Sequence, residues 1–208
     1  MPRVIGVNGI RTDGRDNVVR LLEALHDRGH RTRRFAYPTV WTPLGARIEG
    51  CRLKQSRRLA RTLRDGDHVV AHSFGATLTW YAMSRFRRQL GVVLFLGAAL
   101  DADVSFPARG FRRLVNVHNP CDVALRLGAL LWAHDFGAMG ATGYAGGHPR
   151  IQNVEADVML AGRWNHTAVY FGTAPLVERY ADLFSDAIRQ DAARQPRPEE
   201  AAHVSRED

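Results

Sequence analysis

Residues 68–78 of the chain read HVVAHSFGATL, and this stretch is the most informative part of the sequence about the fold. His68–His72 is a short apolar run that predicts a strand, and Phe74–Arg87 has apolar residues at helical spacing. Ser73 is therefore expected in a sharp turn between a strand and a helix, with small residues two positions away on each side that allow a close strand-helix crossing. Its hydroxyl would then project above the sheet, where the amides of the helix N-terminus also point.

Strands and helices alternate on both sides of this turn. Further strands are expected at Arg3–Val7, Arg33–Tyr37, Val92–Leu96, Leu114–Val117 and Ile151–Val154, and further helices from Asp16 or Asn17 to Gly29, at Cys51–Leu63 and at Ala174–Ile188. Val92–Leu96 is continuously apolar, which is typical of a central parallel strand with helices on both faces. The pattern predicts a three-layer αβα sandwich with a mostly parallel, doubly wound sheet.

The length of 208 residues favours one domain, which we assign to residues 1–189. Two segments do not fit the alternation of strands and helices. Residues 133–150 are rich in glycine and without pattern, which is typical of a functional loop or lid. Residues 190–208 are polar, contain two prolines and are expected to be a disordered tail.

The formal net charge is +8, and Lys54 is the only lysine, so arginine supplies nearly all the positive charge. The densest cluster of cations lies between Arg52 and Arg64, on one face of an expected helix. No aromatic residue is interleaved with these cations, as a base-stacking surface would require. We interpret the cluster as a solvated helix face rather than a surface for nucleic acid or anionic membrane.

Cys51 and Cys121 are the only cysteines, and two reduced thiols are the simpler interpretation than a bridge between them. Neither a zinc site nor a cofactor motif is recognisable. No stretch approaches 18 consecutive apolar residues and no signal peptide is seen at the N-terminus, so a cytoplasmic protein without a transmembrane segment is expected.

A serine hydroxyl is a poor nucleophile unless a base takes its proton and a third group orients that base. Asp122 follows the expected strand Leu114–Val117, and His166 lies between the last expected strand and the closing helix. Both positions belong to the edge of the sheet where open α/β folds place their ligands. We therefore take His166 as the candidate base and Asp122 as the candidate acid.

Other residues compete for these positions. The alternative bases are His118, His134 and His148, and the alternative acids are Asp101 and Asp103. His72 is adjacent to Ser73 in the expected strand, and because neighbouring strand residues point to opposite faces we expect His72 to be structural.

With these residues in place, the chain resembles a compact member of the α/β-hydrolase family, with the Ala-His-Ser-x-Gly form of the nucleophile elbow found in many bacterial lipases and esterases. The resemblance covers about residues 3–188, and the order Ser73, Asp122, His166 is the family's order of nucleophile, acid and base. It implies backbone amides of Phe74 and Ile10 as the oxyanion hole. It also implies a small site without a large cap domain, although Asn8-Gly9 stands where the family usually has His-Gly.

The first functional hypothesis is thus a serine hydrolase that cleaves a small carboxylic ester or thioester through an acyl-enzyme, without a metal or cofactor. The alternative is a catalytically silent binding module whose basic helix meets nucleic acid, anionic lipid or a protein partner. A nucleotide-binding fold is disfavoured, because Gly6, Gly9 and Gly14 lack the required glycine spacing.

Overall fold

The computed structural model describes residues 2–9, 17–37, 49–131, 137–156 and 166–195. Within these ranges, six strands form one sheet in the order β2-β1-β3-β4-β5-β6. All five neighbouring pairs of strands are parallel. The strands are β1 (Val4–Val7), β2 (Thr32–Phe35), β3 (His68–His72), β4 (Leu90–Leu96), β5 (Phe111–His118) and β6 (Ile151–Glu155). The predicted parallel sheet is therefore confirmed.

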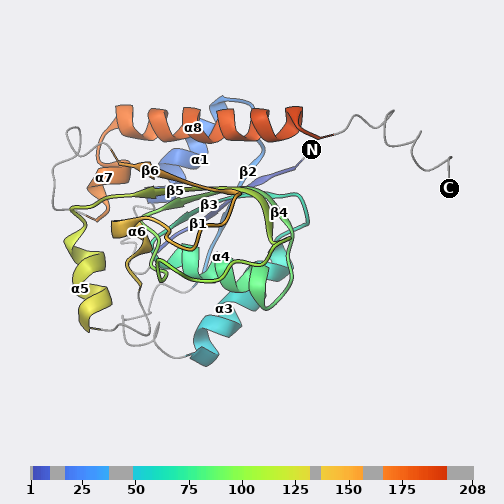
Figure 1. Ribbon diagram of the computed structural model, residues 1–208. Coiled ribbons are helices and arrows are strands. Elements are labelled where there is room, and N and C mark those ends of the chain that lie inside the picture. The colour runs from blue at the N-terminus through green and yellow to red at the C-terminus, as the bar shows by residue number, and fades with distance from the viewer. Residues whose placement is uncertain (1, 10–16, 38–48, 132–136, 157–165, 196–208) are drawn as a thin grey trace.

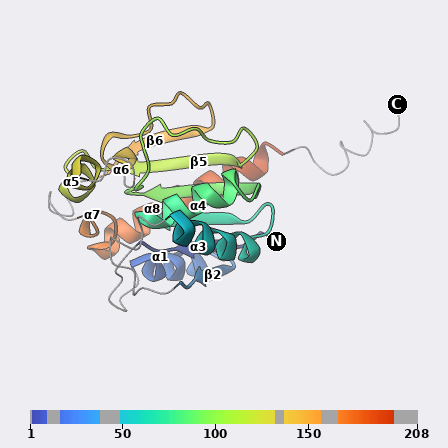
Figure 2. The ribbon, with the colours of Figure 1, turned by 90° about the horizontal axis from the view of Figure 1, so that it is seen from below.

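Helices cover both faces of the sheet (Figure 1). Helices α1 (Asn17–Asp27) and α8 (Ala174–Ala193) lie on one face, and α3 (Glu49–Thr62) and α4 (Phe74–Ser84) lie on the other. Figure 2 shows α3 and α4 crossing the sheet side by side. Three short helices gather at the carboxyl-terminal edge of the strands: α5 (Val123–Leu131), α6 (Met139–Thr142) and α7 (Ala168–Phe171). The three-layer αβα architecture is thus confirmed, and the described residues contain no separate cap domain.

Two hydrophobic clusters, one on each side of the sheet, hold the layers together. All seven residues of β4 are buried, and from Val92 onward they alternate between the clusters: Phe95 belongs to the cluster that contains Phe74 of α4, whereas Leu94 belongs to the cluster that contains Phe184 of α8. Alternate side chains of a strand point to opposite faces, so a continuously apolar strand supplies both layers. This arrangement fixes β3 and the turn after it in the middle of the molecule.

Several elements differ from the sequence-based expectation. Helix α8 continues to Ala193, so the first residues of the expected tail are helical, and residues 196–208 lie outside the described part of the chain. The expected loop 133–150 contains a buried short helix, α6, although residues 132–136 are not described. Cys51 and Cys121 are both free. No helix within the described ranges is long and apolar enough to span a membrane.

Candidate active site

Ser73 occupies the turn between β3 and α4 in a backbone conformation that side chains seldom adopt, with φ 54° and ψ −122°. Such a conformation costs about 1–3 kcal/mol and persists only where the surroundings enforce it. Here the Ser73 amide donates to the Leu96 carbonyl at 3.0 Å, and the Ser73 carbonyl accepts from the Ala99 amide at 3.3 Å. The turn is thus tied to the end of β4, and the strained serine that the sequence predicts is present.

Gly75 allows α4 to pass directly over the end of β1. A Cβ atom at this position would lie 2.3 Å from the Val7 carbonyl oxygen and 2.7 Å from the Asn8 carbonyl oxygen. These are backbone atoms of a buried strand end, so they have little freedom to move aside. The close strand-helix crossing expected from the small residues around Ser73 therefore depends on the absence of a side chain at Gly75.

The loop that follows β1 is held by two side chains. The Asn8 side-chain oxygen accepts a hydrogen bond from the Val18 amide of α1 at 3.3 Å. The Tyr37 hydroxyl lies within hydrogen-bond distance of the Asn8 and Gly9 carbonyl oxygens, at 2.7 and 2.8 Å. Gly9 itself lies against Ser73, because a Cβ at Gly9 would be 3.3 Å from the Ser73 Oγ. Asn8 and Tyr37 thus support the loop at the position where Asn8-Gly9 replaces the His-Gly pair expected from the family resemblance. Ile10, the expected second oxyanion donor, lies outside the described residues.

Asp122 and His166, 44 positions apart in the sequence, meet in a hydrogen bond of 2.5 Å between Asp122 Oδ2 and His166 Nδ1. Asp122 is fully buried, and its other oxygen, Oδ1, accepts from the Leu125 amide at 3.0 Å. That second bond makes Asp122 the N-terminal cap of α5. One carboxylate therefore anchors a helix and orients the imidazole.

The His166 ring lies close to the segment that holds Ser73. A Cβ at Gly97, the residue after β4, would lie 3.0 Å from His166 Cε1 and 2.8 Å from the Tyr170 ring. Gly97 has φ +57°, so both its backbone conformation and its surroundings exclude a side chain. Because Nδ1 faces Asp122, the remaining nitrogen is Nε2, which is buried and has no hydrogen-bond partner among the described residues.

His72 packs directly against His166, with 5.0 Å between the ring centroids. It also contacts the rings of Tyr170 and Phe171 from α7. Burial lowers the pKa of His72 well below its usual value, and the neighbouring His166 lowers it further. The ring is thus neutral at neutral pH. His72 is buried as expected, but it is also in contact with the candidate base, which the sequence did not indicate.

Tyr170 lies behind His166 and is also buried. Burial raises the pKa of its hydroxyl well above the usual value, and the nearby Asp122 carboxylate raises it further. The phenol therefore stays protonated, and together with His72 it surrounds the imidazole with uncharged rings. Sequence reasoning missed His72, Tyr37 and Tyr170 as contributors to the site, because their roles depend on contacts between distant segments.

The competing bases differ in position. His148 packs on Phe111, the first residue of β5, and so lies at the opposite edge of the sheet from Ser73. His118 ends β5 and lies against Gly143, and burial lowers its pKa. His134 lies outside the described residues. The competing acids Asp101 and Asp103 are exposed, whereas Asp122 is buried against His166.

The described part of the glycine-rich segment forms a wall beside the site. The Met139 and Gly140 amides donate to the Leu100 and Ala98 carbonyls at 2.8 and 2.9 Å. A Cβ at Gly140 would lie 2.3 Å from the Gly97 carbonyl carbon, so the two backbones touch. Residues 137–143 are therefore built into the carboxyl-terminal edge of the sheet.

No protein-family model matches the chain, and no curated protein is similar to it in sequence. Solved structures are similar in fold. A protein of the alpha/beta hydrolase superfamily from Xanthomonas campestris pv. campestris matches with a TM-score of 0.54 and 13% identity, over 91% of this chain and 99% of its own. A serine hydrolase without a lid, also from Xanthomonas campestris, matches with a TM-score of 0.53 and 15% identity, over 91% of this chain and 83% of its own. Together with the parallel sheet and the turn at Ser73, these similarities show that the chain has the α/β-hydrolase fold.

Proposed function

We propose that the protein is a serine hydrolase that cleaves a carboxylic ester or thioester through an acyl-enzyme. The observation that carries the proposal is the short bond between His166 Nδ1 and buried Asp122, in an imidazole that packs on His72, the residue before Ser73. A base held in one tautomer by a buried carboxylate is what a serine nucleophile requires. The similarity in fold to a lidless serine hydrolase agrees with this chemistry.

In the proposed mechanism, Asp122 keeps the proton of His166 on Nδ1, so that Nε2 carries a lone pair. His166 Nε2 takes the proton of Ser73 as its Oγ attacks the substrate carbonyl carbon. The backbone amides of Phe74 and Ile10 donate to the resulting oxyanion. The imidazolium then gives its proton to the departing alcohol or thiol. Water, deprotonated by His166, attacks the acyl-enzyme, and release of the acid returns the proton to Ser73.

The test is hydrolysis of short p-nitrophenyl esters by the wild type and by Ser73→Ala. The variant should lose activity by a factor on the order of 1,000 or more, because the covalent route is closed. Ser84→Ala is the matched control: Ser84 ends the same helix, where its hydroxyl bonds to the Trp80 carbonyl. It should retain the wild-type rate.

Equal activity in Ser73→Ala and the wild type would contradict the proposal. A folded wild type that hydrolyses neither esters nor thioesters, but binds polyanions through α3 in a salt-dependent manner, would favour the alternative of a binding module.

A further inference from the structure

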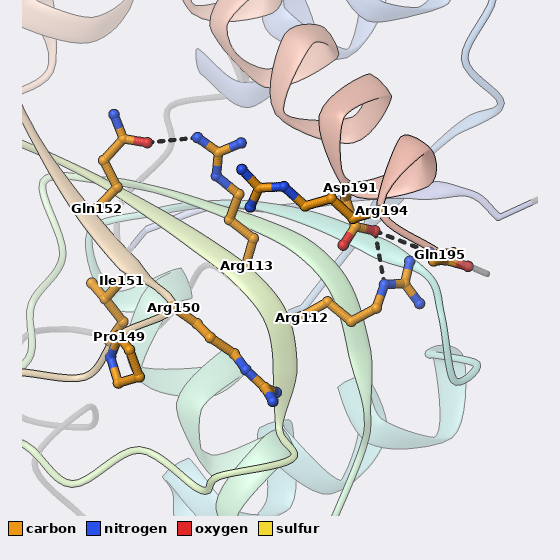
Figure 3. Close-up of a pocket in the computed structure, with 9 residues that line it drawn as sticks. All are labelled: Arg112, Arg113, Pro149, Arg150, Ile151, Gln152, Asp191, Arg194 and Gln195. Atoms are coloured by element: carbon orange, nitrogen blue, oxygen red, sulfur yellow. Dashed lines mark hydrogen bonds and ion pairs between the residues drawn. The ribbon is translucent and has the colours of Figure 1, made fainter.

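A hollow of about 420 Å³ lies at the amino-terminal edge of the sheet, and Figure 3 shows the residues that line it. It is lined by the starts of β5 and β6 and by the end of α8. Arg113 in this hollow is five residues before His118, the last residue of β5, which corresponds to roughly 16 Å along a strand. The hollow is therefore separate from the candidate active site.

The hollow carries an excess of positive charge. Its lining includes four arginines, Arg112, Arg113, Arg150 and Arg194, and a single acid, Asp191. Asp191 accepts a hydrogen bond from Arg112 at 2.7 Å, so this pair is neutral. The lining residues offer no carboxylate to the other three guanidinium groups.

Two of these arginines are held in place by neutral acceptors. Arg113 donates to the side-chain oxygens of Gln190 and Gln152 at 2.6 and 2.7 Å. Arg150 donates to the backbone carbonyls of Ala108 and Phe111 at 3.1 and 3.3 Å. Such partners orient a guanidinium without cancelling its charge. Since the side chains are already ordered, an anion would bind at a smaller entropic cost.

We propose that this hollow binds a small phosphate-bearing polyanion, such as a pyrophosphate or polyphosphate group. Guanidinium groups bind phosphate oxygens through paired N–H donors. Several guanidinium groups offer more donors than a single carboxylate could accept, so a ligand with more than one phosphate fits better. The volume lies within the range of small-molecule sites. None of the lining residues is aromatic, so a nucleobase finds no stacking partner, which favours the polyphosphate over a nucleic acid.

The experiment is calorimetric titration of the full chain with tripolyphosphate at low salt. The wild type should bind one equivalent, and Arg113→Gln/Arg150→Gln should bind it at least about 100-fold more weakly, from about tenfold per lost charged donor. The control is Arg58→Gln/Arg61→Gln, which removes the same charge from the exposed face of α3 and should bind like the wild type.

Equal weakening in both double variants, or loss only in the α3 variant, would overturn the proposal, as would a wild type that does not bind. Sedimentation with vesicles of phosphatidylcholine and phosphatidic acid distinguishes the source of the phosphate. Vesicle binding that is lost in Arg113→Gln/Arg150→Gln and displaced by tripolyphosphate would support the site with a lipid headgroup as its ligand. Neither double variant should change ester hydrolysis, so the outcome is independent of the proposed function.

Discussion

The imidazole rings of His72 and His166 pack against each other with 5.0 Å between their centroids and 30° between their planes. His72 precedes the candidate nucleophile, and His166 is the candidate base. His72 is therefore joined to Ser73 through the backbone and to His166 through ring packing, so a shift of His72 would change the position of both. Because His72 is fully buried, the contact is part of the core and not an exposed feature.

His72→Ala removes the ring that packs on His166, so the His166 imidazole should be held less precisely in position. We expect kcat to fall about 10- to 100-fold with little change in KM, because a small misplacement of a catalytic group is costly in rate and not in binding. The cavity left by the missing imidazole ring should also lower the free energy of unfolding by about 2–4 kcal/mol. His72→Phe keeps a ring at this position and should restore most of kcat. Steady-state kinetics and urea unfolding of both variants provide the measurement, and a kcat for His72→Ala equal to that of the wild type would refute the positioning role.

Asp122→Asn tests the orientation of the imidazole. An amide can donate to Nδ1 and so favours the wrong tautomer, and we expect kcat to fall by a factor on the order of 10,000. Asp103→Asn is the control, because Asp103 is exposed at the same edge of the sheet and should be neutral in the assay. The same loss in both variants would assign the effect to general electrostatics and not to the bond with His166.

Gly75→Ala tests the crossing of α4 over β1. The added Cβ would lie 2.3 Å from the Val7 carbonyl oxygen, so we expect the free energy of unfolding to fall by about 3 kcal/mol or more. Gly50→Ala in α3 has no atom within 4 Å of the new Cβ and should change stability by less than about 1 kcal/mol. Urea titration of the two variants measures the difference. Equal stabilities would mean that the crossing is not tight.

His68 should make the fold sensitive to acid. Burial and the nearby Arg112 lower its pKa from 6.5 to about 4, while its Nδ1 accepts from the Val92 amide at 2.9 Å. Below pH 6.5 the unfolded chain binds a proton at this ring that the folded chain does not. The stability contributed by the neutral ring is therefore complete above pH 6.5 and is lost as the pH falls toward 4, by on the order of 3 kcal/mol.

The measurement is urea unfolding at pH 7 and pH 4.5 for the wild type and His68→Asn, which retains a hydrogen-bond acceptor but does not titrate. The variant should lose less stability between the two pH values than the wild type. If both lose the same amount, His68 does not contribute to the acid sensitivity.

The sequence predicted the parallel sheet and the turn at Ser73 because the signals for both are local. A continuous apolar strand such as β4 and the run from His68 to Gly75 can be recognised within a few residues. Helix α5 was missed because VALRLGALL has a single charged residue and an internal glycine, so few polar side chains mark an exposed helix face. Helices α6 and α7 have four residues each, too few for a period to appear.

The site was predictable in part. Asp122 and His166 follow from their positions after a strand and before the closing helix, and the structure brings them together. The packing of His72 on His166 and the support of Asn8 and Gly9 by Tyr37 join segments that are far apart in the sequence. Such contacts are set by how the layers pack, so no pattern within a single segment indicates them.

The most direct test of the central claim is reaction of the native protein with a fluorophosphonate probe, followed by mass spectrometry of its peptides. The account predicts one adduct, on the Ser73 hydroxyl, and none in a Ser73→Ala variant that has the same circular dichroism spectrum. A folded wild type that stays unlabelled, or that is labelled at another residue and equally in the variant, would contradict the claim that Ser73 is an activated nucleophile.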